Sequence, residues 1–305
     1  MSEIRIGISG WRYAPWRKVF YPEGLVQAKE LAFASRAVNS IEINGSFYAL
    51  QTPQRYAEWR DATPDDFVFA VKAPRYITHV RRLKEIDEPL ANFFASGPLQ
   101  LGAKLGPILW QFPPSLKFDS QRFADFLQRL PHDQAAASQC ARHCAARMKK
   151  DGAFDHDDKG QVRHAVEIRH DSFRDPAFIE LLRKHKVALV VADTAGKWPL
   201  LEDLTADFVY LRLHGDAELY SSGYTDSALQ RWARRIRTWS HGKQPGDAHL
   251  AGPREAATKG AKAIYCYFDN DLKVRAPFDA RALLHRLKLD AHLQTAPGEL
   301  PAPPL

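Results

Sequence analysis

The sequence predicts a single (β/α)8 barrel. Three observations indicate this fold class: eight short apolar runs end in polar or charged residues, segments with helical spacing separate most of them, and 305 residues suffice for one such barrel with loop insertions. The predicted strands are, in chain order, Ile4–Gly10, Ser40–Phe47, Phe67–Pro74, Leu105–Pro113, His164–His170, Val187–Asp193, Phe208–Gly215 and Ala263–Asn270.

The segments between these strands have the periodicity and the end signals of helices. Thr52 is placed to cap one of them, with Pro53 at the first helical position. Residues 194–199, after the sixth strand, have the composition of a loop instead. The predicted helices are Gln27–Val38, Thr52–Arg60, Glu85–Phe94, Asp119–Leu130, Asp175–His185, Asp226–Trp239 and Asp279–Leu287.

The chain shows no internal domain boundary. We expect one barrel domain over residues 1–290 and a Pro-rich tail over residues 291–305, disordered because its end, 297–305, carries four prolines and few apolar side chains. Two polar insertions, 131–162 and 240–262, precede strands. They are therefore expected at the N-terminal face of the barrel, away from the chemistry.

Composition indicates a soluble protein, with 45% hydrophobic and 26% charged residues. No apolar run is long enough for a membrane span, no charged leader precedes the first strand, and three cysteines argue against a disulfide framework. We therefore expect a cytoplasmic protein without a membrane partner. The net charge of +7 comes from scattered basic residues, which indicates a solvated basic surface more than a nucleic-acid site.

Side chains two residues apart in a strand share a face, so polar residues at this spacing are expected inside the barrel. The rule places Glu42 with Asn44, Glu167 with Arg169, and Arg212 with His214 at the C-terminal barrel mouth, where barrel enzymes keep their active sites. It also places Lys72 there. On the eighth strand we expect Cys266, Phe268 and Asn270 to point inward.

Several motifs, in order, resemble those of the YecE-like family (domain of unknown function 72). They include Ile6-Gly7-Ile8-Ser9-Gly10-Trp11, Glu42-Ile43-Asn44-Gly45-Ser46-Phe47-Tyr48, Trp110-Gln111-Phe112-Pro113-Pro114 and Arg212-Leu213-His214-Gly215. The resemblance runs from about Ile4 to Leu287. It implies a TIM-like barrel of bacterial and archaeal cytoplasmic proteins, and it implies no particular reaction. Where the family usually has Phe-Asn-Asn at the last strand, this chain has Asp269, an additional carboxylate at the mouth.

The polar cluster has two interpretations. It is an active site, or it is a buried ion network that fixes the barrel, with Glu42–Arg212 or Glu167–Lys72 as structural pairs. Some pairing is expected either way, because an isolated buried charge costs several kcal/mol. The position at the strand C-termini favours function.

Three mechanisms fit the residues. Glu167, Asp193 and His214 resemble the divalent-metal site of xylose-isomerase-like barrels, although nearby cations would repel a metal. Glu42 and Glu167 could act as the acid and base of a glycosidase, with aromatic residues stacking on the sugar. In the third and preferred mechanism, cationic side chains bind a phosphate or carboxylate, and His214 with Glu167 or Asp193 moves a proton. A Schiff base on Lys72 is a weaker variant, because no second amine is visible to depress its pKa.

We therefore predict acid–base chemistry on a small or nucleic-acid-derived anion, with a metal-dependent enzyme or a non-catalytic anion- or RNA-binding protein as alternatives. No nucleotide or serine-hydrolase motif is present, and the sequence identifies neither a cofactor nor an oligomeric state. The predicted catalytic residues are Glu42, Lys72, Glu167, Asp193 and His214. The predicted substrate-binding residues are Trp11, Asn44, Tyr48, Arg75, His79, Gln111, Arg169, Arg212 and Asn270.

Overall fold

Eight parallel strands close into a barrel in chain order, each strand pairing with the next and the last with the first. The computed structural model describes residues 3–150, 152–154, 160–216, 222–255, 260–270 and 273–299. The predicted (β/α)8 fold is confirmed. The strands are β1 (Ile4–Ser9), β2 (Ser40–Ile43), β3 (Val68–Lys72), β4 (Leu105–Gln111), β5 (His164–Glu167), β6 (Ala188–Asp193), β7 (Phe208–Leu213) and β8 (Ala263–Phe268).

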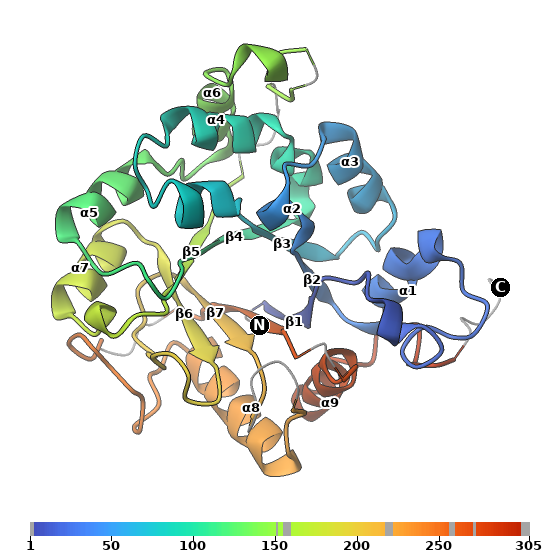
Figure 1. Cartoon of the computed structure of the whole chain (residues 1–305). Coiled ribbons are helices and arrows are strands. Elements are labelled where there is room, and N and C mark those ends of the chain that lie inside the picture. The colour runs from blue at the N-terminus through green and yellow to red at the C-terminus, as the bar shows by residue number, and fades with distance from the viewer. Residues whose placement is uncertain are drawn as a thin grey trace.

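Helices surround the barrel on its outer side (Figure 1). Thr52 caps its helix as predicted, because its side chain accepts a hydrogen bond from the backbone N–H of Arg55, and no helix lies between β6 and β7. The helices are α1 (Glu30–Ala37), α2 (Gly45–Tyr48), α3 (Pro53–Asp61), α4 (Asp87–Ala95), α5 (Ser120–Arg129), α6 (Gln134–Ala141), α7 (Pro176–Lys184), α8 (Asp226–Ser240) and α9 (Ala276–Leu287).

Several strands end earlier than predicted. The predicted run to Phe47 stops at Ile43, and residues 45–48 form the short helix α2 instead. A π-helix, Tyr76–Val80, and a 3-10 segment, Pro98–Lys104, were also not predicted. Phe47 shows the difficulty, because it is apolar but lies beyond the last paired residue of β2; hydropathy alone does not mark where a strand ends.

Two apolar cores lie on either side of the barrel wall. The outer core fills the space between strands and helices and includes Val166, Leu211, Leu213 and Phe268. The inner core is small and fills the barrel interior below the mouth. It consists of Val68, Ala70, Leu109, Ala165, Ala188, Val190, Ala192, Phe208, Tyr210, Tyr265 and Tyr267. Membership of these two cores shows directly which face each strand residue occupies.

The segment after α9 packs on the barrel instead of being disordered. The backbone N–H groups of Gln294 and Thr295 donate to the carbonyl of Arg36, and Gly298 donates to Phe20. The prediction of a tail disordered from residue 291 is therefore wrong for residues 291–299, where backbone hydrogen bonds replace contacts that the composition does not reveal. Residues 300–305 lie outside the described residues.

The two insertions also contain order. The first forms α6, which packs against α4, and Asp133 forms an isolated bridge with Gln161. In the second, the backbone N–H of His249 donates to the Glu202 side chain. Within the first insertion, residues 151 and 155–159 lie outside the described residues. None of the described helices is both long and apolar enough to cross a membrane.

Gly7 allows β1 to approach β2 closely. A Cβ atom at this position would lie 1.7 Å from the carbonyl oxygen of Ser40, which is backbone and has no freedom to move aside. We predict that Gly7→Ala lowers the free energy of unfolding by about 1–3 kcal/mol or more, as forced overpacking does. Urea denaturation measures the change. Gly246→Ala is the matched control, because nothing lies within 4 Å of a Cβ there; equal stability of the two variants would contradict the prediction.

Candidate functional site

Arg212, at the end of β7, lies at the centre of a buried ion network. Its side chain is fully buried and contacts carboxylates from three other strand ends. Nη2 lies 2.9 Å from Oε1 of Glu42 and 2.8 Å from Oδ2 of Asp269, and Nη1 lies 2.8 Å from Oε2 of Glu167. The predicted pair Glu42–Arg212 is therefore present, whereas Glu167 pairs with arginines and not with Lys72.

The two glutamates of the network have no spare acceptor capacity. Glu42 also accepts hydrogen bonds from the hydroxyls of Ser9 and Tyr210, at 2.5 and 2.6 Å. Glu167 accepts from Gln111 Nε2 at 3.0 Å and from Arg169 Nε at 2.9 Å. Burial alone would raise the pKa of Glu167, but the charges of Arg169 and Arg212 outweigh it and hold the pKa well below its usual value. Glu167 is therefore a permanent anion at neutral pH.

Asp269 connects this network to the mouth. Its Oδ2 atom lies 3.1 Å from Nδ1 of His214, and its side chain keeps 13% of its exposure. Burial would raise the pKa of Asp269, but Arg212 and the hydrogen bond with His214 lower it below the usual range. The substitution noted in the sequence thus supplies the third carboxylate of the network.

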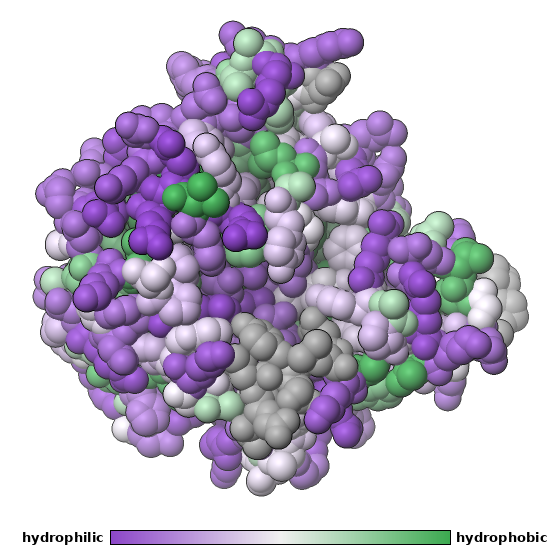
Figure 2. Space-filling model, viewed as in Figure 1, coloured by the Kyte–Doolittle hydropathy of each residue, from purple (hydrophilic) through white to green (hydrophobic). Residues whose placement is uncertain are grey.

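A cavity of about 520 Å³ lies above the network at the barrel mouth. Figure 2 shows hydrophilic residues gathered at the centre of this face. The cavity contains seven of the predicted site residues, Asp269, which the sequence indicated as an additional carboxylate at the mouth, and Tyr13 and Phe47, which were not selected from the sequence. Its lining is Tyr13, Asn44, Phe47, Tyr48, Lys72, Arg75, His79, Gln111, Arg169 and Asp269. Four predicted residues do not line the cavity but lie in the layer directly beneath its lining, which we call the floor: Glu42, Glu167, Arg212 and His214.

Lys72 is the buried amine of this cavity. It is 7% exposed, and its Nζ lies 4.2 Å from the centre of the Phe47 ring. Burial and the charge of Arg212 lower the pKa of Lys72 to about 8, although three carboxylates of the network oppose the shift. Both protonation states of the amine are therefore populated near neutral pH.

Two further groups complete the rim. His79, on the π-helix, shares a hydrogen bond with Thr78 through Nδ1, and burial together with Arg169 lowers its pKa to about 4, so it is neutral at pH 7. Arg169 stacks on Trp198, with 3.8 Å between the guanidinium carbon and the ring centre. This stacking fixes the guanidinium beside the cavity.

Asp193 and Asn270 do not reach the cavity, and their placement by the sequence is wrong. On β6 the inward side chains are Ala188, Val190 and Ala192, so Asp193 faces outward and accepts a hydrogen bond from Tyr224 at 3.1 Å. Burial raises the pKa of Asp193.

On β8 the expected orientation is reversed. Tyr265 and Tyr267 point inward, while Cys266 and Phe268 belong to the outer core. Asn270 therefore points outward and donates to Asp279 at 2.8 Å. Trp11 also lies away from the mouth: it packs edge-on against Trp59 and lines a neighbouring cavity.

The metal site considered from the sequence is not assembled. Asp193 lies on the opposite side of the barrel wall from Glu167 and His214, and two arginines occupy the space around Glu167. Over the part of the chain that the structure describes, no group of three His, Cys, Asp or Glu residues is arranged to hold a metal ion.

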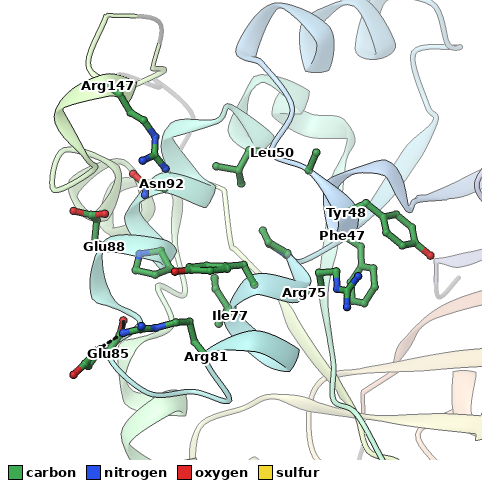
Figure 3. Close-up of a pocket in the computed structure, with 14 residues that line it drawn as sticks. Phe47, Tyr48, Leu50, Arg75, Ile77, Arg81, Glu85, Glu88, Asn92 and Arg147 are labelled. Atoms are coloured by element: carbon green, nitrogen blue, oxygen red, sulfur yellow. Dashed lines mark hydrogen bonds and ion pairs between the residues drawn. The ribbon is translucent and has the colours of Figure 1, made fainter.

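Two cavities adjoin the mouth. One, of about 490 Å³, shares Phe47, Tyr48 and Arg75 with it and extends toward α4 (Figure 3). Arg81 and Glu85 form an ion pair at its edge. The other, of about 320 Å³, shares Tyr13, Asn44 and Tyr48 with the mouth. The exposed side chain of Tyr48 thus lines all three cavities.

Comparison with known proteins identifies relatives. The model of a family described as a protein of unknown function, DUF72, matches residues 5–304. YecE of Escherichia coli K12 is 34% identical over 127 residues, which cover 37% of this chain and 44% of YecE. YunF of Bacillus subtilis is 33% identical over 116 residues, covering 36% and 40%. The aligned region spans less than half of either relative.

Solved structures show the same fold. A DUF72 family protein from Thermotoga maritima superposes with a TM-score of 0.69 and 24% identity, covering 94% of this chain and 99% of that one. Another from Enterococcus faecalis gives 0.65 and 18%, covering 94% and 96%. At these identities the likeness establishes the fold alone.

We predict that Arg212→Met lowers the free energy of unfolding at pH 7 by about 3–5 kcal/mol, because it leaves buried carboxylates without a counter-charge. Urea denaturation followed by circular dichroism measures the loss. The matched control is Arg129→Met, which removes an exposed ion pair with Asp87 and should cost less than about 1 kcal/mol. Similar losses for both variants would show that the network contributes no special stability.

The stability difference between wild type and Arg212→Met should depend on pH. In the wild type, the lowered pKa of Glu167 contributes stability that is complete above the ordinary value of 4.5 and is lost as the pH falls through the folded-state pKa. Without Arg212 the carboxylates protonate at higher pH, which relieves their burial. The difference should therefore be largest at pH 7 and shrink toward pH 4.5. If the stability difference between the two proteins were the same at every pH, the loss would come from packing alone.

Proposed function

The chain belongs to the DUF72 family of unknown function, and we propose that it is a cytoplasmic enzyme that performs acid–base chemistry on a small or nucleic-acid-derived anion at the barrel mouth. One observation carries the proposal: a cavity of about 520 Å³ places the cations Lys72, Arg75 and Arg169 above a floor whose charges are already paired. The three described cysteines are free thiols, which agrees with a reducing compartment.

Arg75 is the substrate anchor in this proposal. It is exposed at the rim, and within the described ranges no carboxylate lies in ion-pair contact with it. A guanidinium in this position offers two parallel N–H donors to a phosphate or carboxylate. Arg169, held by Glu167 and Trp198, provides a second donor in a fixed orientation. Two guanidinium groups at one cavity suit an anion better than a neutral sugar.

Neutral polar groups supply selectivity. Asn44 donates to Ser9 at 2.7 Å, while its buried Oδ1 accepts no hydrogen bond from the described residues. A buried acceptor without a donor carries a desolvation cost, which a substrate hydroxyl or N–H group would remove. Gln111 belongs to the same lining and is oriented by Glu167.

Lys72 is the group that moves the proton. General acid–base catalysis works best with a pKa near the working pH, and the pKa of Lys72, about 8, meets this condition. The carboxylates of Glu42 and Glu167 are committed to arginines, so they position the floor. Asp269, in the cavity lining, pairs with His214 beneath it, and this pair is able to stabilise charge that develops during the reaction.

A non-catalytic anion- or RNA-binding protein is the second candidate. The net charge of +7 and the two cavities that adjoin the mouth favour an extended polyanion. Such a protein would hold its ligand through arginines and would not require a titrating amine. A substitution at Lys72 therefore distinguishes the two candidate functions.

We predict that the wild-type protein depletes one or more anionic metabolites from a deproteinised bacterial extract, as measured by mass spectrometry, and that Lys72→Met does not. The wild-type rate should change with pH near 8, since that is where Lys72 titrates. Lys29→Met, at an exposed site, is the matched control and should keep full turnover.

The opposite result would support the binding protein. In that case no metabolite is depleted, and the affinity for a single-stranded RNA oligonucleotide falls steeply with salt because counterions are released on binding. Lys72→Met would then reduce RNA affinity only by the contribution of one cation.

A further inference from the structure

Three buried lysines in the described chain are held in different ways. Lys104 donates from Nζ to the carbonyl oxygens of Arg60 and Thr63, and Lys262 donates to that of Ala206. Both have the hydrogen bonds that a buried ammonium group needs. Lys72 has no such acceptor among the described residues, and its Nζ faces the Phe47 ring. Lys104 and Lys262 stabilise the fold through these hydrogen bonds, and Lys72 does not have the same role.

The carboxylates near Lys72 are engaged elsewhere. Glu42, Glu167 and Asp269 all lie within ion-pair distance of Arg212, and none of them lies within 4 Å of the Lys72 amine. The amine is thus desolvated, within the electrostatic influence of Arg212, and located at the end of β3 in a cavity that Arg75 and Arg169 also line. Desolvation next to other cations is the environment that activates a lysine as a nucleophile.

We propose that Lys72 is a covalent nucleophile that forms a Schiff base with the aldehyde or ketone carbon of a substrate that also carries a phosphate or carboxylate. The proposal rests on the proposed function and deepens it, because it names the substrate class as a carbonyl compound with an anionic group. The carbonyl would lie over Phe47, and the anion would lie on Arg75 or Arg169 at the rim of the same cavity.

The covalent step balances without any added reagent. The Nζ lone pair of the free amine attacks the carbonyl carbon, and the C–O π pair moves to oxygen to give a carbinolamine. Proton transfer to this oxygen then releases water and leaves the imine. In sum, the ammonium form and the carbonyl compound give a protonated imine and one water, so the positive charge beside Asp269 is conserved. The protonated imine then acts as an electron sink for breaking a bond at the adjacent carbon.

The geometry of the site suits this chemistry. A cavity of about 520 Å³ accommodates a small metabolite. The pKa of Lys72, about 8, leaves a fraction of free amine at neutral pH on the order of a hundred-fold larger than that of an ordinary lysine. His79, neutral because of its lowered pKa, adds an imidazole at the rim that bears no competing charge.

Borohydride trapping tests the proposal. The full chain is incubated separately with glyoxylate, pyruvate, dihydroxyacetone phosphate and glyceraldehyde 3-phosphate, reduced with sodium borohydride, and analysed by peptide mass spectrometry. With at least one probe we expect an adduct on Lys72 with the mass of the probe less one oxygen atom. Lys72 should be labelled more than ten-fold above exposed Lys18 and above buried Lys104. Labelling should rise with pH through 8.

Variants sharpen the result. Lys72→Arg keeps the charge and should give no adduct at this position. Arg75→Met should reduce labelling by the anionic probes several-fold. Labelling by acetone, an additional probe without an anionic group, should not change. Absence of a Lys72 adduct with all four probes, or labelling no stronger than at Lys18, overturns the proposal.

Failure of this proposal can be distinguished from failure of the proposed function. If inorganic phosphate raises the thermal unfolding midpoint of the wild type and not of Arg75→Met, while no probe labels Lys72, the anion site remains and the covalent step is wrong. If neither phosphate nor any probe has an effect, both proposals are wrong. Exposed Lys29→Met serves as the control for both measurements.

Discussion

The pairing of one buried arginine with three carboxylates is the constraint on which the mouth of this barrel depends. Arg212 on β7 holds Glu42 from β2, Glu167 from β5 and Asp269 just after β8. The strands at whose ends the three carboxylates lie, β2, β5 and β8, do not pair with one another, so a single guanidinium links three separate parts of the barrel rim. Hydroxyls from Ser9 and Tyr210 fill the remaining acceptor sites of Glu42. A buried charge network is stable only when it is satisfied in this way.

The same pairing explains why Lys72 has no carboxylate partner among the residues that the structure describes. Arginine forms bidentate contacts and cannot lose its proton, so it outcompetes lysine for the carboxylates of a crowded site. Lys72 then contacts an aromatic face and the cavity instead. The network has a stabilising role and also a chemical one, because it holds three carboxylates away from the amine and keeps Glu167 and Asp269 ionised. A structural interpretation of the cluster and a functional one are thus compatible, with Arg212 in the floor and Lys72 above it.

The sequence could assign a strand residue to the inner or outer face of the barrel only where polar and apolar side chains differ clearly between the two faces of that strand. On β2 and β7, and from Glu167 to Arg169 at the end of β5, polar residues alternate with apolar ones, so the inward face of Glu42, Glu167 and Arg212 was predictable; on β3, Lys72 was placed by its spacing from Ala70. On β6 and β8 both faces are apolar or aromatic. Tyr267 and Phe268 differ too little for alternation to decide between them, and Asp193 lies after an alanine that faces inward. The wrong placement of Asp193 and Asn270 follows from that ambiguity.

The lining of the cavity needed more than strand periodicity, because much of it comes from backbone beyond the strand ends. The chain turns into α2 directly after β2, and this turn brings Phe47 over the amine of Lys72, which belongs to the next strand. The π-helix after β3 similarly carries His79 to the rim. Asn44-Gly45 and Pro74 mark where these two strands end, but they do not show that Phe47 and His79 turn back toward the mouth. The aromatic cover over Lys72 removes water from the amine, and the lowered pKa of Lys72 depends on that exclusion. The reactivity of the site is thus set by a contact between two adjacent strand ends, while its rigidity is set by contacts across the barrel.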